Sequence, residues 1–177
     1  MGIFMMKRFL TALPFTLAAL SAQAMSDAKT IEMMDPESGE KMGTVTIEEH
    51  DDGLVFTPSL TGLEPGGHGF HVHENPSCES AMKNGDETPA GAAGSHYDPE
   101  KTDSHGYPWS DNSHMGDLPL LYVGEDGDAK HPVIATRLSM SDIEDRALMV
   151  HAGGDNYSDS PEKLGGGGAR ALCGVIK

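Results

Sequence analysis

The sequence predicts a small all-β domain built as an antiparallel sandwich or barrel, and three observations lead to this class. The apolar runs are short and separated by turn residues, and the 177-residue chain has 22 Gly and 11 Pro. Residues 74–119 show little periodicity of either helix or strand. A helical turn is indicated only for residues 139–146. Short strands, long loops and little helix are typical of sandwiches and barrels.

The first half of the chain holds four strand signals. A strand is expected around residues 30–34. Residues 44–47 and 54–57 are rich in β-branched and apolar side chains and flank Asp51-Asp52-Gly53, which predicts a hairpin. Residues 69–73 form another short strand after the turn at 64–67. The long stretch that follows needs something to order it, because loops of this length are uncommon inside compact domains. A disulfide and a metal would do so.

Strand signals resume after that loop, at residues 120–123, 147–151 and 171–176. Between them, the helical turn at 139–146 is expected to begin at Ser141 as N-cap, with Glu144 at the third helical position. A second loop, which contains four consecutive glycines at 165–168, precedes the last strand.

Length and charge restrict the function classes. A chain of this length suggests one domain. It carries 12 Lys and Arg against 28 Asp and Glu, a formal net charge of −16, which disfavours nucleic acid and anionic lipid as partners. After the N-terminus no apolar run approaches the ~20 residues of a membrane span. We therefore expect no nucleic-acid partner and no membrane span.

The N-terminus has the pattern of a secretory signal peptide. Lys7 and Arg8 precede an apolar stretch at residues 9–20, and Ser21-Ala22-Gln23-Ala24 ends in an A-x-A pattern. We expect cleavage after Ala24, so that residues 1–24 are the signal peptide and 25–177 the folded domain. Loss of the two basic residues leaves 10 Lys and Arg against 28 acidic side chains. The predicted location is the periplasm.

Export also affects the interpretation of the two cysteines. In an oxidising compartment Cys78 and Cys173 most simply form one intramolecular disulfide. Two free thiols or an intermolecular bridge are the alternatives.

Most of the nine histidines fall in the two loops and the strands that bound them. His71 and His73 are two residues apart on a predicted strand, so both imidazoles lie on one face and can reach one ion. His151, at the end of another strand, would complete that site. A second set has the composition of a closed, structural zinc site; it consists of His96, His105, His114 and Asp117.

Two segments carry a resemblance to a known family. Gly69-Phe70-His71-Val72-His73-Glu74-Asn75-Pro76 and the C-terminal residues 165–176 resemble the signatures of the copper–zinc superoxide dismutases, in particular the exported bacterial branch. The similarity runs from about residue 30 to the end. It implies an eight-stranded antiparallel Greek-key barrel whose two long loops form the metal site. It also implies conversion of superoxide to dioxygen and hydrogen peroxide by alternate reduction and oxidation of copper, with one copper and one zinc per subunit.

The resemblance assigns roles to individual residues. Copper would be held by His71, His73, His96 and His151, and zinc by His96, His105, His114 and Asp117. His96 would bridge the two metals and carry a proton. Asp155 would link His71 to His105, Cys78 and Cys173 would form the family disulfide, and Arg170 would orient superoxide beside copper.

Other functions and the assembly state stay open at this point. The chain could instead be an exported copper and zinc buffer or delivery protein without turnover, or a structural sandwich in which metal only holds the loop. The first would tend to lose Arg170 and the second its copper ligands, whereas this sequence keeps both. Trp109 is expected either to pack under the zinc loop or to lie at a subunit contact, and we expect a homodimer.

Overall fold

The computed structural model of the chain describes residues 1–2, 28–83 and 85–177. Apart from its first two residues, the predicted signal peptide lies outside the described residues. Within the described ranges no helix is long and apolar enough to cross a membrane.

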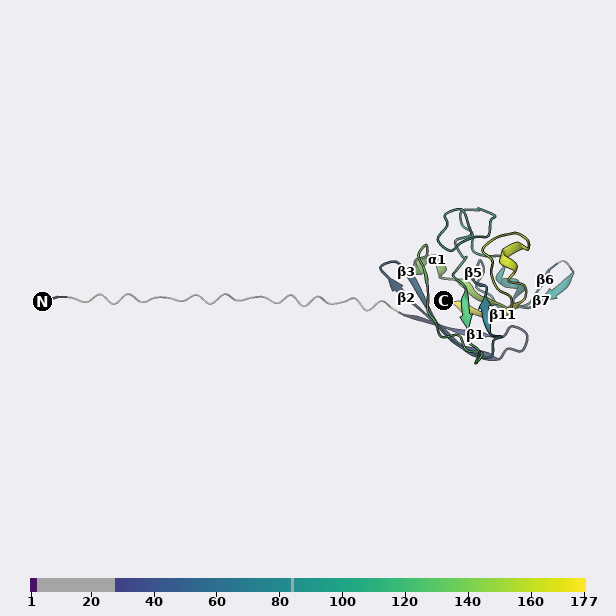
Figure 1. The fold of residues 1–177 in the computed structure, drawn as a ribbon, viewed down its shortest axis with the longest axis horizontal. Helices are drawn as coiled ribbons and strands as arrows, with labels where there is room; N and C mark the ends of the chain where they lie inside the picture. Colours follow the sequence, from purple (N-terminus) through teal and green to yellow (C-terminus); the bar gives the residue numbers. More distant parts are fainter. Residues whose placement is uncertain (3–27, 84) are drawn as a thin grey trace.

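The described residues are mostly strand and loop (Figure 1). The strands are β1 (Lys29–Met34), β2 (Lys41–His50), β3 (Gly53–Leu60), β4 (Gly66–His68), β5 (Phe70–His73), β6 (Ala81–Lys83), β7 (Asp86–Thr88), β8 (Leu121–Val123), β9 (Val133–Ala135), β10 (Arg146–His151) and β11 (Arg170–Ile176). The helical elements are one short α-helix, α1 (Met140–Ile143), and two 3-10 turns, η1 (Gly91–Ala93) and η2 (Lys163–Gly166).

One curled antiparallel sheet dominates, in the order β5-β10-β11-β1-β2-β3-β9, and β4 pairs with β8 beside it. β3 is followed along the chain by β4 but has β9 as its neighbour in the sheet, the type of crossing that defines a Greek key. β4 and β5 are one strand interrupted at Gly69, and β6 and β7 form a separate hairpin at the side of the domain (Figure 1). Counted in this way, the barrel has the eight strands that the resemblance implies.

The alternation of buried and more exposed side chains along the strands determines which face of the sheet packs against the core. In β3 the buried positions are every second residue, including Leu54, Phe56 and Leu60. Phe56 meets Phe70 edge to face, with ring centroids 5.8 Å apart. β5 and most of β10 are buried throughout, because the core covers one of their faces and the loops cover the other.

Two local predictions need correction, and some short strands are not predicted from the sequence. The helical turn begins at Met140 with Ser139 as N-cap, not Ser141, because the Asp142 carboxylate accepts the Ser139 N–H at 2.8 Å. Gly66 and Gly67 form β4 instead of a turn, since they pair with β8. The sequence pattern does not predict β9 or the β6–β7 hairpin; their strands are three residues each, too short to show an alternating pattern.

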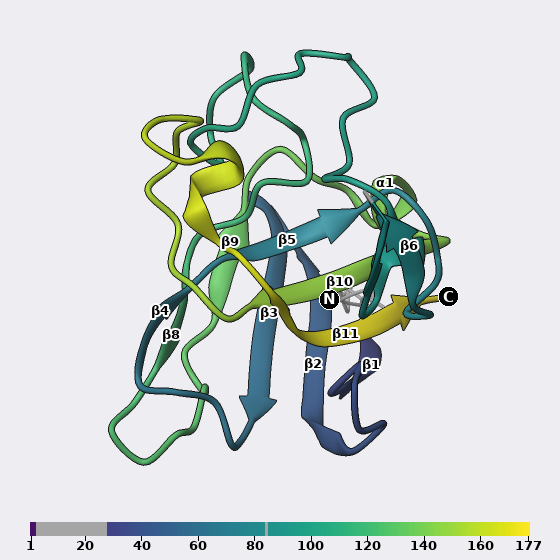
Figure 2. The same cartoon turned by 90° about the vertical axis from the view of Figure 1, so that its right-hand side faces the viewer.

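Two loops rise from the same end of the sheet, above β5 (Figure 2). They are the later part of the 74–119 segment, in teal, and the segment between β10 and β11, in yellow. The predicted intramolecular disulfide is confirmed: Cys78 joins Cys173 across a Cα–Cα distance of 5.7 Å. It ties the chain just after β5 to β11, and so anchors the first loop to the sheet.

Candidate metal centre

The first histidines lie on β5, at the edge of the seven-stranded sheet. His71 and His73 lie on β5, with β10 on one side. The other edge of β5 is covered by the long loop, which forms isolated bridges that place Asp117 opposite His71 and His96 opposite His73. His151 ends β10, directly across from Arg170 on β11. Backbone pairing therefore brings together residues that lie far apart in the chain.

Four imidazoles form the first donor group. One nitrogen from each of His71, His73, His96 and His151 lies within 4.8 Å of the others, and all four residues are buried. Within the described part of the chain, the buried nitrogens without a hydrogen-bond partner are His71 Nδ1, His73 Nε2, His96 Nε2, His151 Nε2 and His105 Nδ1. Unpaired buried polar atoms are costly, so the convergence of the first four of these nitrogens from several elements fits a cation.

The opposite nitrogen of three of these rings faces an acceptor outside the group. His71 Nε2 lies 2.8 Å from Asp155 Oδ2, and His73 Nδ1 lies 3.1 Å from the Gly94 carbonyl. His151 Nδ1 lies 3.4 Å from the Gly168 carbonyl. Such contacts fix the tautomer, because the nitrogen next to an acceptor carries the hydrogen and the other is left as a ligand. The arrangement therefore presents lone pairs to a common point.

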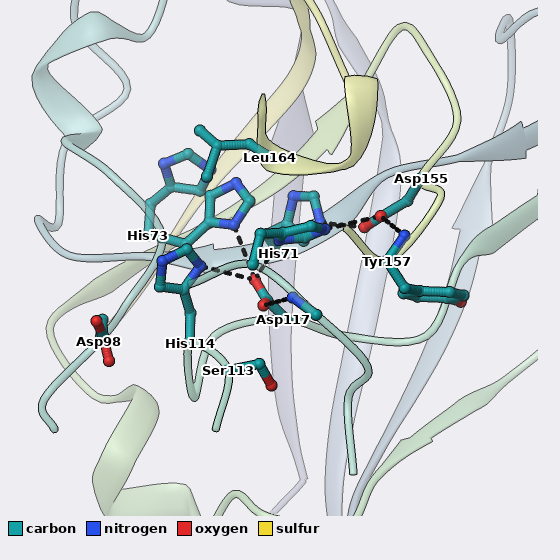
Figure 3. A network of polar contacts seen from close by, with 12 residues as sticks. His71, His73, Asp98, Ser113, His114, Asp117, Asp155, Tyr157 and Leu164 are labelled. Atoms are coloured by element: carbon teal, nitrogen blue, oxygen red, sulfur yellow. Dashed lines mark hydrogen bonds and ion pairs between the residues drawn. The ribbon is translucent and has the colours of Figure 1, made fainter. Parts of the chain in front are cut away.

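Asp117 is at the centre of a second group (Figure 3). Its Oδ1 lies 2.8 Å from His96 Nδ1, 3.0 Å from His105 Nδ1 and 3.3 Å from His114 Nδ1. Ligand atoms bound tetrahedrally to zinc at about 2.0 Å lie roughly 3.3 Å apart. The Gly106 N–H donates to Asp117 Oδ2 at 3.0 Å and holds the carboxylate. These four residues have the composition and spacing of a zinc set.

A second set of donors whose ligand atoms all lie within 4.8 Å of one another contains His71 in place of His114. Both nitrogens of His71 are already used, however, because Nε2 faces Asp155 and Nδ1 faces the first group, whereas His114 Nδ1 faces Asp117. His96 differs, since its Nε2 is unpaired and its Nδ1 faces Asp117. Among the described donors, His96 alone presents one nitrogen to each group.

Asp155 connects the two groups, because its carboxylate contacts one imidazole of each (Figure 3). Its two oxygens lie 2.8 Å from His71 Nε2 and 2.7 Å from His105 Nε2, and its side chain is buried. Gly165, at φ +71°, allows this contact, because a Cβ there would lie 2.0 Å from Asp155 Oδ1. Gly165 is thus required for close approach of the second loop to the carboxylate.

Burial sets the charge state of the first group. Burial and the neighbouring imidazoles hold the pKa of His71 and of His73 well below the usual range, and burial lowers the pKa of His151 to about 4. Neutral imidazole is the form that binds metal. In the second group burial again opposes charge, but contacts with Asp117 and Asp155 outweigh it and raise the pKa of His105 to about 9.

Arg170 stands at the edge of the first group. Its guanidinium donates to the Ala90 carbonyl and, at 2.6 Å, to the Gly94 carbonyl, which also faces His73. Burial lowers the pKa of Arg170 from its ordinary value. The two carbonyls hold a positive charge beside the four imidazoles, where an anion would approach.

The structure also shows supporting residues that the sequence does not reveal. Asp159 accepts the backbone N–H of His105 at 2.8 Å and that of Leu164 at 3.0 Å, joining the two loops. The Glu74 carboxylate accepts the Ser95 N–H at 2.9 Å, next to His96. Both are ordinary acidic residues in polar loops, so no spacing marks them. His68 contacts the carbonyls of His151 and Glu64 at 2.7 Å.

A Greek-key β-barrel with two buried donor groups that share one imidazole defines a β-barrel metalloprotein with a paired metal site. Comparison with known proteins makes this specific: the sequence model of the copper/zinc superoxide dismutases matches residues 41–176. The chain belongs to the copper/zinc superoxide dismutase family, whose members use copper and zinc.

Individual relatives are similar to this chain in sequence along most of their length. The superoxide dismutase [Cu-Zn] of Photobacterium leiognathi is 51% identical over 167 residues, covering 94% of this chain and 95% of the relative. The Cu/Zn superoxide dismutase structure from Brucella abortus has a TM-score of 0.82 and 51% identity, covering 85% of this chain and 100% of that one. The monomeric enzyme from Salmonella enterica has a TM-score of 0.75 and 49% identity, covering 85% and 99%.

Proposed function

We propose that this chain is an exported superoxide dismutase, which converts two superoxide anions and two protons into dioxygen and hydrogen peroxide. The observation that carries the proposal is the pair of buried donor groups that share His96, with Arg170 beside one of them. Copper bound by the first group would supply the redox chemistry, and zinc bound by the second would supply a fixed positive charge that orders the loop.

We assign the ligands from the free nitrogens and the contacts of Asp117. The copper ligands are His71, His73, His96 and His151. The zinc ligands are His96, His105, His114 and Asp117. Asp155 fixes the His71 and His105 rings and is not itself a ligand, because both its oxygens are engaged by ring nitrogens.

His96 is the residue we assign to proton transfer. Its Nδ1 is held toward Asp117, which leaves Nε2 as the atom that takes up a proton and passes it to the reduced product. Burial lowers the pKa of His96, which favours release of that proton.

Arg170 binds and orients the anion. Its guanidinium is held by two backbone carbonyls and has further N–H groups to offer an oxygen anion. Replacement by glutamate should slow the reaction sharply by placing a negative charge where the anion must sit. An unchanged rate constant for Arg170→Glu would remove the arginine from the mechanism.

The decisive test is the superoxide-consumption rate of residues 25–177 loaded with one copper and one zinc per chain. A rate constant near the diffusion ceiling of about 10⁸–10⁹ M⁻¹s⁻¹ is expected. Slow turnover with both metals bound would instead support an exported copper and zinc buffer or delivery protein.

Periplasmic location rests on the N-terminal pattern of residues 1–24 and is consistent with the bacterial relatives. Mass spectrometry of protein released from the periplasm should find a mature chain that begins at Met25. An intact N-terminus on a protein confined to the cytoplasm would contradict export.

Two exposed aromatic rings support a homodimer. Tyr107 and Trp109 are 51% and 65% exposed, and their rings stack 5.2 Å apart beside Tyr157. Trp109 does not pack under the zinc loop. Analytical ultracentrifugation should give a dimer that Trp109→Ser disrupts and Tyr122→Ser, at an exposed residue on β8, does not. A monomer at all concentrations, the state of the relative from Salmonella enterica, would exclude this assembly.

A further inference from the structure

Arg137 lies outside both metal loops, two residues after the end of β9, yet its side chain reaches the zinc loop. The side chain is only 12% exposed. We propose that Arg137, acting through Ser113, is a positioning residue for the zinc half of the site: it fixes the turn that presents His114 and Asp117. The inference rests on the proposed zinc set and assigns a role to residues outside it.

Three hydrogen bonds join the guanidinium to this turn. Arg137 Nη1 donates to Ser113 Oγ at 3.2 Å and to the His114 carbonyl at 3.3 Å, and Nη2 donates to the Ser113 carbonyl at 3.2 Å. The planar fork of arginine suits such a set, because it directs several N–H groups at neighbouring acceptors from one rigid group.

Ser113 carries the contact further into the loop. It is 2% exposed, and its hydroxyl lies 2.9 Å from both the Tyr107 and Ser110 carbonyls. In Figure 3 Ser113 lies next to His114, on the side of the turn away from the other imidazoles. Arg137 therefore holds the start and the end of the 107–114 turn through one buried hydroxyl.

The His114 carbonyl, which accepts a hydrogen bond from Arg137, also connects the two proposed zinc ligands His114 and Asp117. The Asp117 N–H donates to the His114 carbonyl at 3.3 Å, while the His114 N–H donates to the Ser104 carbonyl at 3.0 Å. Displacement of the His114 carbonyl would move both the His114 ring and the Asp117 carboxylate. Both must stay within a few tenths of an ångström for zinc to be held well.

Charge pairing does not explain why an arginine stands here. Within the described part of the chain, the ion pair of Arg137 is with Asp111, whose carboxylate oxygen is 3.8 Å from Arg137 Nε and whose side chain is 98% exposed. An exposed pair of this kind contributes little. A largely buried cation that donates to backbone carbonyls instead has the geometry of a residue that fixes a turn.

The test measures metal binding as well as activity. Arg137→Met keeps the apolar stem and removes the donors. We expect the affinity for zinc, measured by competition with a chromogenic chelator, to fall about 10- to 100-fold, the usual cost of losing a residue that orients a ligand. Cobalt(II) bound in place of zinc should show altered visible bands. Asp111→Asn, the matched control on the same turn, should leave both unchanged.

Two further variants keep the test decisive if Arg137→Met folds poorly. Ser113→Ala should weaken zinc binding in the same direction, and Arg137→Lys should not restore it, because one ammonium cannot reproduce the fork. Zinc affinity and cobalt spectra like those of the wild type in Ser113→Ala and in folded Arg137→Met would overturn the inference, even if unfolding became easier. If the wild type itself bound no zinc, or His114→Ala left the cobalt spectrum unchanged, the proposed ligand set would be at fault instead.

Discussion

The two halves of the metal centre differ in the structure that holds their donors: strands for one half and loops for the other. Three of the four donors assigned to copper lie on the paired strands β5 and β10, with His151 at the end of β10 paired to Arg170 of β11. Of the donors assigned to zinc, His105 and His114 lie in irregular loop, and the backbone of His96 and Asp117 pairs with β5 through isolated bridges. The sheet therefore pre-forms the copper half, whereas the zinc half needs its metal and a few side-chain contacts to keep its shape.

The largest contrast should come from removing one ligand on each side. His73→Ala leaves the β5 ladder intact but removes a copper donor, so we expect activity to fall at least about 100-fold, more than the loss of an orienting residue costs. His114→Ala should lose zinc and increase amide exchange across residues 98–117, with a smaller loss of activity.

Metal analysis, superoxide consumption and hydrogen exchange on the same samples check this contrast. Exchange in β5 and β10 should stay slow in both variants. If His73→Ala loosened the strands as much as His114→Ala loosens the loop, the copper half would not be pre-formed by the sheet.

The disulfide should matter next, because it anchors the start of the loop to β11. A Cys78→Ser, Cys173→Ser double variant frees a closed loop with a sequence separation of 95, and we expect the free energy of unfolding of the metal-free protein to fall by roughly 2–5 kcal/mol. Denaturant titration measures this directly. The variant should also weaken the hold of Ala90 and Gly94 on Arg170, so the rate of the metal-loaded protein should drop too. An unchanged rate would mean that the loop keeps these carbonyls in place unaided.

The sequence predicts the strand-borne half better than the loop-borne half, for a physical reason. His71 and His73 show their common face through the period of two that every strand imposes. The main strands are predicted for the same reason, although several of their ends differ from the structure by a few residues. β9, the β6–β7 hairpin and the N-cap at Ser139 depend on pairing or capping partners that local pattern does not reveal.

The loop donors follow no such period, so the sequence groups them only by composition, and the resemblance to a family assigns their individual roles. His105 and His114 are brought to Asp117 by contacts whose partners lie far away in the sequence, such as Arg137 with Ser113 and Asp159 with the His105 backbone. No spacing rule connects those residues. The resemblance supplies the donors, and the structure adds what holds them.

Substitution of Asp155 tests whether the copper and zinc halves are independent, because its carboxylate contacts one imidazole in each half. Asp155→Asn leaves only one acceptor oxygen, so one of the two rings loses its fixed orientation. We expect the affinity for zinc to fall about 10- to 100-fold, with a smaller effect on copper. Asp159→Asn is the matched variant, since Asp159 contacts His105 through the backbone alone and should affect zinc only. Equal losses of copper affinity in the two variants would remove Asp155 as the connection between the halves.

The smallest effect concerns charge at the copper half. The folded domain carries far more acidic than basic side chains, so long-range forces repel superoxide, and attraction must come from groups near the site such as Arg170.

The Debye length falls from about 30 Å at 0.01 M salt to about 8 Å at 0.15 M. Comparing the wild type with Arg170→Gln isolates this charge, because both share every other group. The ratio of their rate constants should shrink by about twofold over that range as salt screens the arginine. Pulse radiolysis at several ionic strengths measures it. A ratio that does not change with salt would mean that Arg170 acts by orienting the bound anion alone, and that the copper half attracts superoxide through other groups.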